Sequence, residues 1–492
     1  MSSKAKGKRR AETAAPQPPK AADPEDSDEG EDLEFEDEFG DEFEEEEYAE
    51  QGEEGEEGEN EELEDMEDDD GVGPDVEGRL WRAGDAIPEG EKLDYDSSAY
   101  DMLHRLNLEW PCLTFAFARD NLGESRTKYP MTAFTVAGTR ADTAAQNQII
   151  CAKLSSLART RHDEDSDSDD GDDDDDADAD PIIEAQRIPH QGTVNRLKLM
   201  PQSANMCATW ADTGQVHIFD LAAPLANLFK PGSAGPAAVE AAQKPVFTFR
   251  GHHDEGFALD WSPARPGCLA SGDCANAIHV WQPGEAGRWT VDAEAYQGHT
   301  ASVEDVAWSP AEANVLMSCG CDSTVRVWDT RRKSGSALCV DEKHGRDVNV
   351  ISWNRLVNYL VVSGCDDGSF RVWDLRSLSS GEPVAKFHWH KAAITSVEWS
   401  PLDSSSLAVA GEDHQLTLWD LALEEDPDAE AAQAGRPDLQ DIPPQLYFVH
   451  QGQQDIKEVH WHPQLPGVLG STAADHFHIF KPANHGDGAG AS

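Results

Sequence analysis

A histidine recurs along this chain at a fixed distance from an aromatic residue that ends a β-rich run. In five copies the two residues are 29 positions apart, and in a sixth copy, from His450 to Phe480, they are 30 apart. Nine residues after most of these histidines stands a large apolar residue, often followed by Ser-Pro. The regular pairs are His190 and Phe219, His252 and Trp281, His299 and Trp328, His344 and Trp373, and His390 and Trp419. The chain is therefore expected to fold as a repeat architecture.

Each unit has the pattern of four short strands. Val303 to Trp308 and Ser323 to Asp329 alternate as half-buried strands do, and Gly, Asp and Pro stand at the turns. The units resemble the WD-repeat family in the dipeptides that end three of them, Trp328-Asp329, Trp373-Asp374 and Trp419-Asp420. This resemblance implies a β-propeller in which each unit is one blade.

The six units supply blades two to seven, so the first blade must come from upstream. Four β-rich runs are available there: Leu113 to Ala118, Met131 to Ala137, Gln148 to Leu154 and Ile182 to Ile188. Blade seven is then one strand short, and Tyr100 to Leu108 can complete it, because Tyr100, Met102, Leu106 and Leu108 would share one face of a strand; the same residues also fit a short helix. Such a strand would close the ring and remove an exposed edge. We expect an all-β, seven-bladed WD-repeat β-propeller over residues 95–482.

Acidic residues are concentrated outside the blades. Of the formal charge of −57, residues 23–70 hold 31 acidic residues in 48 and residues 163–180 hold 13 in 18. Such segments repel themselves and have too little apolar surface to form a core. We expect residues 1–90 to be disordered, with a basic start before the Glu/Asp-rich tract. We also expect a disordered acidic insert at 160–181, loop inserts at 222–245 and 422–444, and a disordered tail at 483–492.

Cysteine usage and hydropathy predict an intracellular protein. The nine cysteines are scattered and contain no CxxC pair, which favours reduced thiols in the cytosol or nucleus. No apolar run approaches the roughly 20 residues that span a bilayer. The basic cluster Lys4 to Arg10 resembles a nuclear localisation signal, so nuclear import is expected.

The recurring histidines and aspartates could be interpreted as metal ligands or catalytic groups. Their spacing favours the internal hydrogen-bond network of a WD blade, because an aspartate stands six positions before the tryptophan in three copies. These predicted structural sets are His299, Asp322 and Trp328; His344, Asp367 and Trp373; and His390, Asp413 and Trp419. Blades two, three and seven have Asp212, Asp273 and Asp475 out of register, so looser hairpins are expected there.

No motif predicts catalysis or a cofactor. Cys319 and Cys321 could chelate a metal from one strand face, but a zinc site needs about four ligands and no partner pair is evident. The chain has no glycine-rich phosphate loop and no Gly-x-Ser-x-Gly elbow at the start of a helix. We therefore expect no catalytic residue, no cofactor and no metal.

The first acidic tract also carries regularly spaced aromatic residues. Acidic runs often serve only solubility, but these aromatics could grip an apolar spot on a basic protein while the carboxylates mask its charge. The aromatics, at spacings of four and five, are Phe35, Phe39, Phe43 and Tyr48. They are predicted to bind a basic protein client.

The region from Gly90 to Ala141 and the blades after it resemble the glutamate-rich WD-repeat proteins. The resemblance rests on segments that generic WD repeats do not share: Trp110 to Leu113, Asp120 to Gly123, Val136 to Thr139 and Ile188 to Gly192. It implies a nuclear and nucleolar factor that escorts a basic large-subunit ribosomal protein in ribosome biogenesis. Histone and chromatin binding is the alternative, and neither a membrane nor direct nucleic-acid binding is expected.

A double-proline segment resembles a loop of the histone-binding propellers, which are wider relatives. The predicted partner-binding residues around it are Glu424, Glu425, Asp426, Asp438, Asp441, Pro443 and Pro444. Those relatives also use a long N-terminal helix, whereas glycines and a proline interrupt residues 76–92 here. This departure favours the ribosomal client over histones.

Two Trp-Asp-x-Arg endings suggest a different class of partner. Asp329 with Arg331 and Asp374 with Arg376 match the ending found in substrate receptors of cullin ubiquitin ligases. The same four residues also fit ordinary strand-end chemistry, in which Arg shields Asp. A ligase-adaptor contact is therefore the third functional hypothesis.

Overall fold

The computed structural model describes residues 96–160, 180–230, 243–333, 335–340, 345–424 and 442–484. By its internal contacts the chain divides into two units, Met1–Val76 and Glu77–Ser492. All the described residues belong to the second unit.

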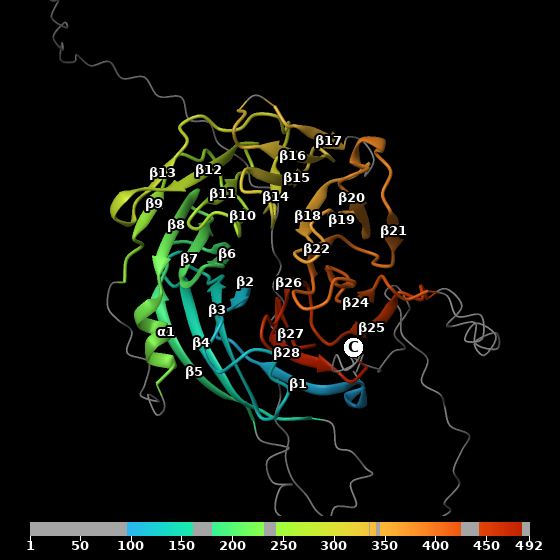
Figure 1. The fold of residues 1–492 in the computed structure, drawn as a ribbon. Helices are drawn as coiled ribbons and strands as arrows, with labels where there is room; N and C mark the ends of the chain where they lie inside the picture. The colour runs from blue at the N-terminus through green and yellow to red at the C-terminus, as the bar shows by residue number, and fades with distance from the viewer. Residues whose placement is uncertain are drawn as a thin grey trace, which may run out of the picture. The chain divides into compact units, whose positions relative to one another are not determined.

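Seven four-stranded antiparallel sheets stand around a central axis as the blades of a propeller (Figure 1). Blade one is β2 (Cys112–Phe117), β3 (Met131–Thr139), β4 (Gln148–Leu157) and β5 (Ile182–Pro189). Blade two is β6 (Val194–Met200), β7 (Ser203–Ala211), β8 (Gln215–Asp220) and β9 (Phe247–Phe249). Blade three is β10 (Ala258–Trp261), β11 (Leu269–Gly272), β12 (Ile278–Pro283) and β13 (Trp289–Val291).

The remaining blades repeat the same order. Blade four is β14 (Val303–Trp308), β15 (Val315–Gly320), β16 (Val325–Asp329) and β17 (Leu338–Val340). Blade five is β18 (Val348–Trp353), β19 (Leu360–Cys365), β20 (Ser369–Asp374) and β21 (Ala385–His388). Blade six is β22 (Ile394–Trp399), β23 (Ser406–Gly411), β24 (Leu416–Asp420) and β25 (Leu446–His450). Blade seven is β26 (Ile456–Trp461), β27 (Leu469–Ala473), β28 (Phe477–Pro482) and β1 (Tyr100–Leu106). The prediction of an all-β, seven-bladed propeller is confirmed.

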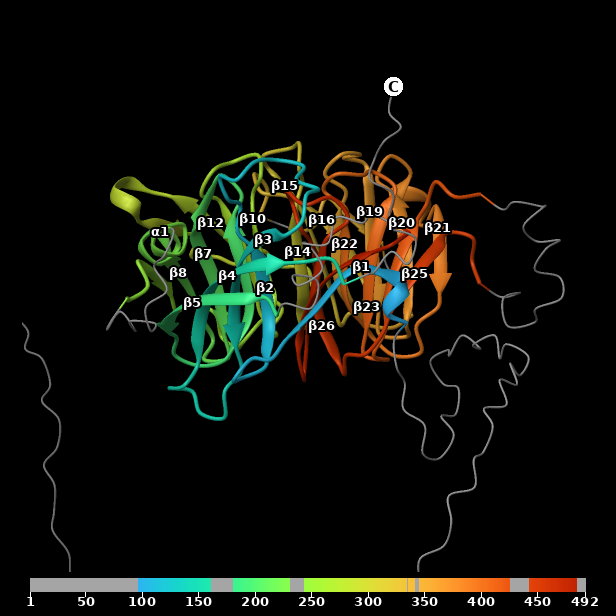
Figure 2. The same ribbon diagram turned by 90° about the horizontal axis from the view of Figure 1, so that it is seen from below.

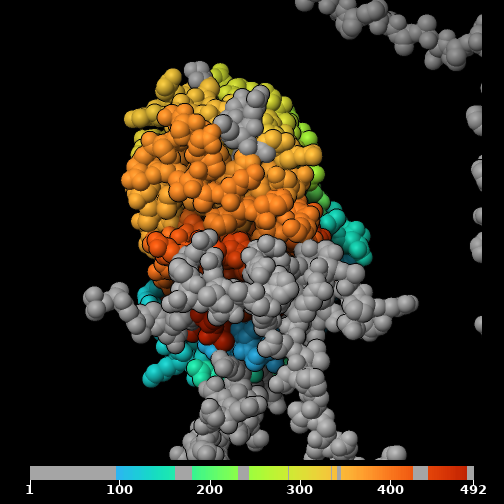
Figure 3. Space-filling model, turned by 90° about the vertical axis from the view of Figure 1, so that its right-hand side faces the viewer, coloured from blue at the N-terminus to red at the C-terminus, as the bar shows by residue number. Residues whose placement is uncertain are grey.

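The N-terminal strand β1 closes the ring by pairing with β28. Tyr100 lies opposite Pro482 and Leu106 lies opposite Phe477, so the edge of the last blade is covered. In the space-filling view the blue surface of this strand meets the red surface of the C-terminal strands (Figure 3). The strand interpretation of this segment is correct, and the helical alternative is wrong.

One detail of the closing strand differs from the prediction. A register shift between Tyr100 and Met102 turns the two side chains to opposite faces. Tyr100 packs with Phe448 and Phe480, whereas Met102 and Leu106 pack against the core of blade one. The four apolar residues therefore do not share one face, because the bulge breaks the two-residue period.

The core lies between adjacent blades and is dominated by aromatic residues. The tryptophans of the third strands are at most 1% exposed, namely Trp281, Trp328, Trp373 and Trp419.

The tight turns between second and third strands need a residue in the left-handed conformation. Gly368 has φ of 78°, and a Cβ there would lie 2.3 Å from the carbonyl oxygen of His390. Side chains are thus excluded from this turn.

The two ends of the propeller are distinguished by strand direction. The upper end is the one where the first strands of the blades begin, as at Val303. The lower end is the one where these strands finish, as at Trp308. Figure 2 shows the blades from the side. Connections from third to fourth strands lie at the lower end.

The connection after β8 begins with helix α1 (Ala222–Leu228), which buries Leu225 and Leu228. The predicted loop insert at 222–245 is therefore helical at its start. Among the described residues, the other short helical turns are η1 (Ser97–Ala99), η3 (Glu285–Gly287) and η4 (Leu378–Ser380).

Candidate functional site

The first strands line the central channel, and their polar side chains join each blade to the next. At four interfaces a carboxylate accepts a hydrogen bond from a backbone N–H of the following blade. The pairs are Asp260 with Trp308 (2.8 Å), Asp305 with Ile351 (3.1 Å), Glu398 with Trp461 (2.8 Å) and Glu458 with Phe115 (2.8 Å). The other three interfaces use Thr114 with Leu197 (2.9 Å), Ser352 with Trp399 (3.4 Å) and Arg196 with the carbonyl of Phe257 (3.0 Å). These side chains therefore stabilise the contacts between adjacent blades around the ring.

Four of the channel residues form a buried charge cluster. The Arg196 guanidinium lies 2.6 Å from Glu458, and His460 lies 3.1 Å from Glu398 and 3.2 Å from Glu458. Burial opposes the charge on His460, but the two carboxylates together hold its pKa above the ordinary value. Burial likewise opposes the charge on Glu458, and His460 and Arg196 hold its pKa well below the ordinary value. The cluster is therefore an ionised network rather than a set of neutral groups.

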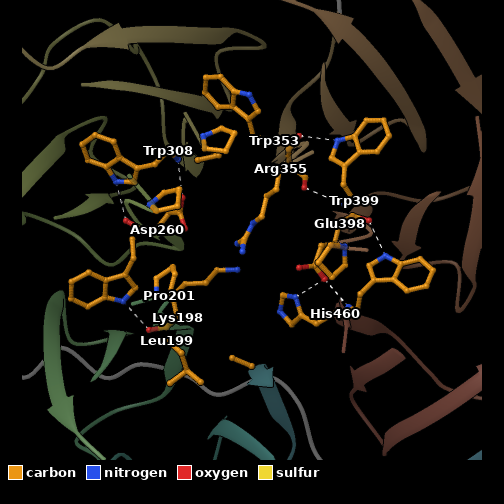
Figure 4. Close-up of a pocket in the computed structure, with 18 of the residues that line it drawn as sticks. Lys198, Leu199, Pro201, Asp260, Trp308, Trp353, Arg355, Glu398, Trp399 and His460 are labelled. Carbon is orange, nitrogen blue, oxygen red and sulfur yellow. Dashed lines mark hydrogen bonds and ion pairs between the residues drawn. The ribbon is translucent and has the colours of Figure 1, made fainter. Parts of the chain in front are cut away.

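The lower mouth of the channel is a cavity of about 270 Å³. Its wall contains the apolar residues that mark the repeat and the prolines that follow most of them. The tryptophans are Trp261, Trp308, Trp353, Trp399 and Trp461, and the prolines are Pro201, Pro263, Pro310, Pro401 and Pro463. Figure 4 shows Lys198 and Arg355 extending from this wall into the channel. An apolar rim thus surrounds these two cations together with the carboxylates of Asp260, Asp305 and Glu398, which line the same cavity.

The predicted structural histidine sets have similar geometry in blades four and six. His299 Nδ1 lies 2.9 Å from Asp322 and its Nε2 lies 2.6 Å from Ser318, which also accepts from the indole N–H of Trp328 at 2.7 Å. In blade six the corresponding contacts are His390 to Asp413 (2.8 Å), His390 to Thr417 (2.9 Å) and Trp419 to Thr417 (2.8 Å). Each set links the loop before the first strand to the turn between the second and third strands and to the tryptophan of the third strand.

Blade three was expected to depart from this arrangement, and that expectation is wrong. His252 Nδ1 lies 2.9 Å from Asp273 and its Nε2 lies 2.7 Å from Ser271, which accepts from Trp281. The turn after Asp273 is longer and contains Asn276 at φ 67°. Because the longer turn absorbs the extra residues, the aspartate reaches the histidine although its spacing to the tryptophan differs.

Blades two, five and seven carry other arrangements. His190 bonds to the carbonyl of Gly192 at 2.9 Å and to Thr209 at 3.0 Å. In blade five Asp367 accepts from Ser369, and Trp373 donates to Ser363 at 2.7 Å; the third predicted member, His344, lies outside the described residues. His450, the last residue of β25, reaches blade seven: its Nδ1 lies 2.8 Å from the hydroxyl of Tyr100 and its Nε2 lies 3.1 Å from His478.

Comparisons with known proteins agree with this architecture. The family model described as "WD domain, G-beta repeat" matches residues 292–329, 335–374 and 381–420. The model described as "Histone-binding protein RBBP4", which also covers a component of the CAF1 complex, matches residues 90–158. Among solved structures, the WD40 β-propeller domain of Doa1 is similar with a TM-score of 0.51 at 13% identity, covering 79% of this chain and 98% of that one. The last similarity is one of fold.

Curated relatives match most of the chain. Glutamate-rich WD repeat-containing protein 1 of Dictyostelium discoideum is 47% identical, with 82% of this chain and 85% of that protein covered. The chain belongs to the glutamate-rich WD repeat-containing protein family. Ribosome assembly protein rrb1 of Schizosaccharomyces pombe is 42% identical over 82% of this chain and 84% of its own length. Protein HEAT STRESS TOLERANT DWD 1 of Arabidopsis thaliana is 46% identical over 84% of this chain and 92% of its own.

In this glutamate-rich WD-repeat protein the two Trp-Asp-x-Arg endings have the same geometry. Arg331 makes a bidentate contact to Asp329 with a closest distance of 2.7 Å, and Arg376 does the same to Asp374 at 2.6 Å. The arginine side chains are 70% and 65% exposed. Both pairs lie at the lower end, on neighbouring blades four and five. The arginines therefore shield the aspartates while remaining accessible.

The double-proline segment lies where blade six receives its fourth strand. The carbonyl of Pro443 accepts from Leu446 at 3.0 Å, Gln445 donates to the carbonyl of Leu423 at 3.0 Å, and Pro444 is exposed. Glu424 is exposed at the other side of the same connection. The predicted partners Glu425, Asp426, Asp438 and Asp441 lie outside the described residues, as do Phe35, Phe39, Phe43 and Tyr48 of the acidic tract.

The acidic segments of this family member all join the propeller at its lower end. Asp96, which follows the N-terminal tract, precedes β1 at the end where Tyr100 pairs with Pro482. The acidic insert 163–180 connects β4 to β5, and the acidic part of 422–444 connects β24 to β25. Both are connections from a third to a fourth strand. Segments that are far apart in sequence are thus tethered to one end.

Lys198 and Arg355 were not predicted as site residues. One signal was available for Arg355: Trp353-Asn-Arg355 replaces the Trp-Ser-Pro of neighbouring repeats. Across the described ranges, no group of three or more His, Cys, Asp or Glu side chains is placed to hold a metal ion. The helices found in those ranges are all too short or too polar to cross a membrane.

Proposed function

We propose that this chain is a non-enzymatic binding protein of the nucleus and nucleolus that acts in ribosome biogenesis. In this proposal it escorts a basic large-subunit ribosomal protein before assembly. The name of the fission yeast relative, a ribosome assembly protein, and the glutamate-rich family both support this role. The basic N-terminal cluster Lys4 to Arg10 supports nuclear import.

The observation that carries the proposal is the common exit of the acidic segments. Residues 23–70 and 163–180 together contribute 44 acidic side chains, and both join the propeller at its lower end. Carboxylates on segments that are tethered to one end would raise the local concentration of a basic partner and speed its capture. A Lys- and Arg-rich ribosomal protein would be bound there and kept from unspecific contacts with RNA.

The proposal is tested by identifying the proteins that copurify with the full chain. Nuclease-treated extract is used, so that RNA does not bridge the partners, and a variant lacking residues 23–70 is compared by mass spectrometry. We expect one ribosomal protein to dominate and to be lost with the deletion. A matched variant keeps every carboxylate but replaces Phe35, Phe39, Phe43 and Tyr48 by Ser, which separates aromatic contacts from charge. Recovery of the ribosomal protein at the same level by all three chains would contradict the role of the tract.

Charge-driven capture also predicts a salt dependence. Affinity for the basic client should fall steeply between low and physiological salt, where the Debye length is about 8 Å. Binding that does not change with salt would place the client on apolar propeller surface instead.

A histone-binding role is the second candidate. It is favoured by the match of residues 90–158 to the histone-binding family model and by the double-proline segment. Replacing Pro443 and Pro444 by Ser should then remove histones from the purified protein while leaving ribosomal proteins in place. Histones that copurify equally with this variant would argue against that loop.

A further inference from the structure

The outermost strand of blade one is long, and its outer edge is open. β5 has eight residues, whereas the outermost strands of blades two to six have three to five. It is the last strand of its sheet, on the outer side of the blade (Figure 1). Within the described ranges, the backbone of β5 forms hydrogen bonds with the backbone of β4 alone. One row of N–H and C=O groups of β5 is therefore available to a further strand.

The other long outermost strand, β1, has its edge covered by the chain itself. The backbone N–H of Leu103 donates to the hydroxyl of Thr160 at 3.0 Å, and the backbone N–H of Thr160 donates to the carbonyl of Asp101 at 3.1 Å. No described residue covers the edge of β5 in this way. The pairing of β5 with β4 has no bulge, and no Pro or Lys stands between Ile182 and Ile188. Three of the features that protect an edge strand from pairing are thus missing.

One face of β5 borders an apolar groove. The groove has a volume of about 130 Å³ and lies between β4, β5 and the segment that follows β1. Its apolar wall is formed by Leu108 and Trp110, by Ile150, Ala152 and Leu154 of β4, and by Ile183 and Ala185 of β5. On the opposite face of the strand, Ile188 belongs to the core in which helix α1 packs. The groove therefore lies on one side of the open edge only.

The open edge and the groove together specify an extended peptide chain. A chain that pairs with the edge of β5 places every second side chain on the face of Ile183 and Ala185, and so toward the groove. A helix would leave the edge unpaired, because its own N–H and C=O groups are used internally. Since the wall of the groove is apolar, it takes an apolar side chain in preference to a polar one.

The charge around β5 favours a basic partner over a second copy of this chain. Residues 163–180, which precede β5 in the sequence, hold 13 acidic residues, and Asp180 is exposed just before the strand. The rim of the groove adds one carboxylate, that of Glu109, and one guanidinium, that of Arg187. Two copies that paired through β5 would bring their acidic runs together, which is unfavourable. A segment that carries Lys or Arg beside its apolar positions is attracted instead.

We propose that the outer edge of β5 binds an extended segment of a basic protein partner as a fifth strand of blade one, with alternate apolar side chains entering the groove beside Ile183. The acidic run supplies attraction at long range, and the strand pairing fixes register and orientation. The docking goes beyond the capture by charge proposed above. It rests on the proposed function only for the identity of the partner, which is the basic client.

The docking is tested by fluorescence anisotropy with the purified full chain and synthetic peptides. The probe peptide alternates Val with Thr over the length of β5 and carries Lys at both ends. A reference peptide has the same composition, but its Val residues are grouped so that the alternation is lost. We expect the alternating probe to bind about tenfold more tightly, because only it presents all its apolar side chains on one face.

Backbone methylation of the probe distinguishes strand pairing from side-chain contact. One peptide is N-methylated at its Val residues and another at its Thr residues. In a fifth strand the N–H groups of alternate residues face β5 and the others face solvent. One methylated peptide should therefore lose binding and the other should keep it. Probe binding should also slow the hydrogen exchange of β5 amides.

Two substitutions on the same strand form a matched pair. Ile183→Ser removes an apolar side chain from the face of the groove, and Ile182→Ser removes one from the opposite face. The two residues are 45% and 55% exposed, so both variants should stay folded. We expect Ile183→Ser to weaken probe binding about fivefold and Ile182→Ser to leave it within about twofold.

Several results overturn the proposal. They are no binding of the probe, equal binding of the alternating and grouped peptides, equal effects of the two methylations, and equal effects of Ile183→Ser and Ile182→Ser. Self-association of the full chain that is lost with Ile183→Ser would assign the edge to a second copy and would overturn it as well. The probe experiment contains no client, so its failure is distinct from a failure of the copurification test of the proposed function.

Discussion

Arg196 and Glu458 form an ion pair of 2.6 Å although 262 positions separate them in the sequence. Arg196 belongs to the first strand of blade two and Glu458 to the first strand of blade seven. The ion pair therefore joins, inside the channel, the two blades that flank blade one. Glu458 also accepts the backbone N–H of Phe115 in blade one. One carboxylate thus ties together three consecutive blades, including the one completed by the N-terminal strand.

Glu458→Gln is expected to destabilise the propeller strongly. The substitution keeps the shape but leaves the buried charges of Arg196 and His460 without their common partner, a loss of about 3 kcal/mol. The free energy of unfolding is measured in urea. Glu412→Gln, an exposed glutamate at the upper end, is the control and should change it by less than about 0.5 kcal/mol. Equal effects of the two substitutions would contradict the tie across blades.

His460 should make stability depend on pH. Burial opposes its charge, but Glu398 and Glu458 raise its pKa in the folded chain above the ordinary value. A histidine with a raised folded pKa contributes stability that is fully present below the unfolded pKa and is lost as the pH rises through the folded pKa. The difference in melting temperature between the wild type and His460→Gln should therefore shrink as the pH rises above the ordinary histidine value of 6.5. Comparing the two chains cancels the opposite contribution of buried neutral histidines such as His450, whose pKa burial lowers to about 3. A difference in melting temperature that does not change as the pH rises would show that the charge on His460 does not contribute to stability.

The hydrogen-bonded aspartates should matter only in the blades where they meet a histidine. Asp322→Ala removes the acceptor of His299 and of the backbone N–H of Thr300, and we expect a loss of about 2 kcal/mol. Asp212→Ala is the matched control in blade two, where His190 bonds to Gly192 and Thr209 instead. Thermal unfolding of both variants checks this. If Asp212→Ala proved as costly, the assignment of the network to particular blades would be wrong.

The fold could be predicted because its signals are periodic and local. The His-to-aromatic spacing located six blades, and alternation located the strands of blade one. The same spacing failed for Asp273, because a longer turn changes the count between aspartate and tryptophan without changing their positions in space. The alternation of apolar residues likewise failed to predict the two faces of β1. The bulge between Tyr100 and Met102 is set by pairing with β28 and leaves no mark in the sequence.

The candidate site was less predictable than the fold. The acidic runs were evident from composition, but their common exit depends on which ends of β1, β4 and β24 face the same side. Lys198 and Arg355 are 157 positions apart by their numbering and come together only when the ring closes. Single-repeat patterns carry no information about contacts between repeats. The residues inside the channel therefore required the structure.

Tyr100 should contribute to closure through its hydroxyl as well as its ring. Tyr100→Phe leaves Nδ1 of the buried His450 without its partner at 2.8 Å, and we expect a loss of about 1 to 2 kcal/mol. Tyr100→Ala removes the ring contacts with Phe448 and Phe480 as well and should cost about 3 to 5 kcal/mol. Urea unfolding measures both. Glu109→Ala, an exposed change beyond the strand, is the control. If neither tyrosine variant lowered stability, the N-terminal strand would not be needed to hold the last blade.

Arg331 and Arg376 separate the ligase hypothesis from ordinary strand-end chemistry. Replacing both by Gln breaks two exposed Asp–Arg pairs at the lower end, and because these pairs are solvent-exposed the melting temperature should change little. If the arginines contact a cullin ligase adaptor, the double variant should lose its recovery in affinity purification, since a bidentate arginine at an interface is not replaced by an amide. Arg288→Gln removes an exposed arginine of blade three at the same end without touching either ending, and the adaptor should still be recovered with it. Unchanged recovery with the Arg331 and Arg376 variant would mean that the two endings only shield their aspartates.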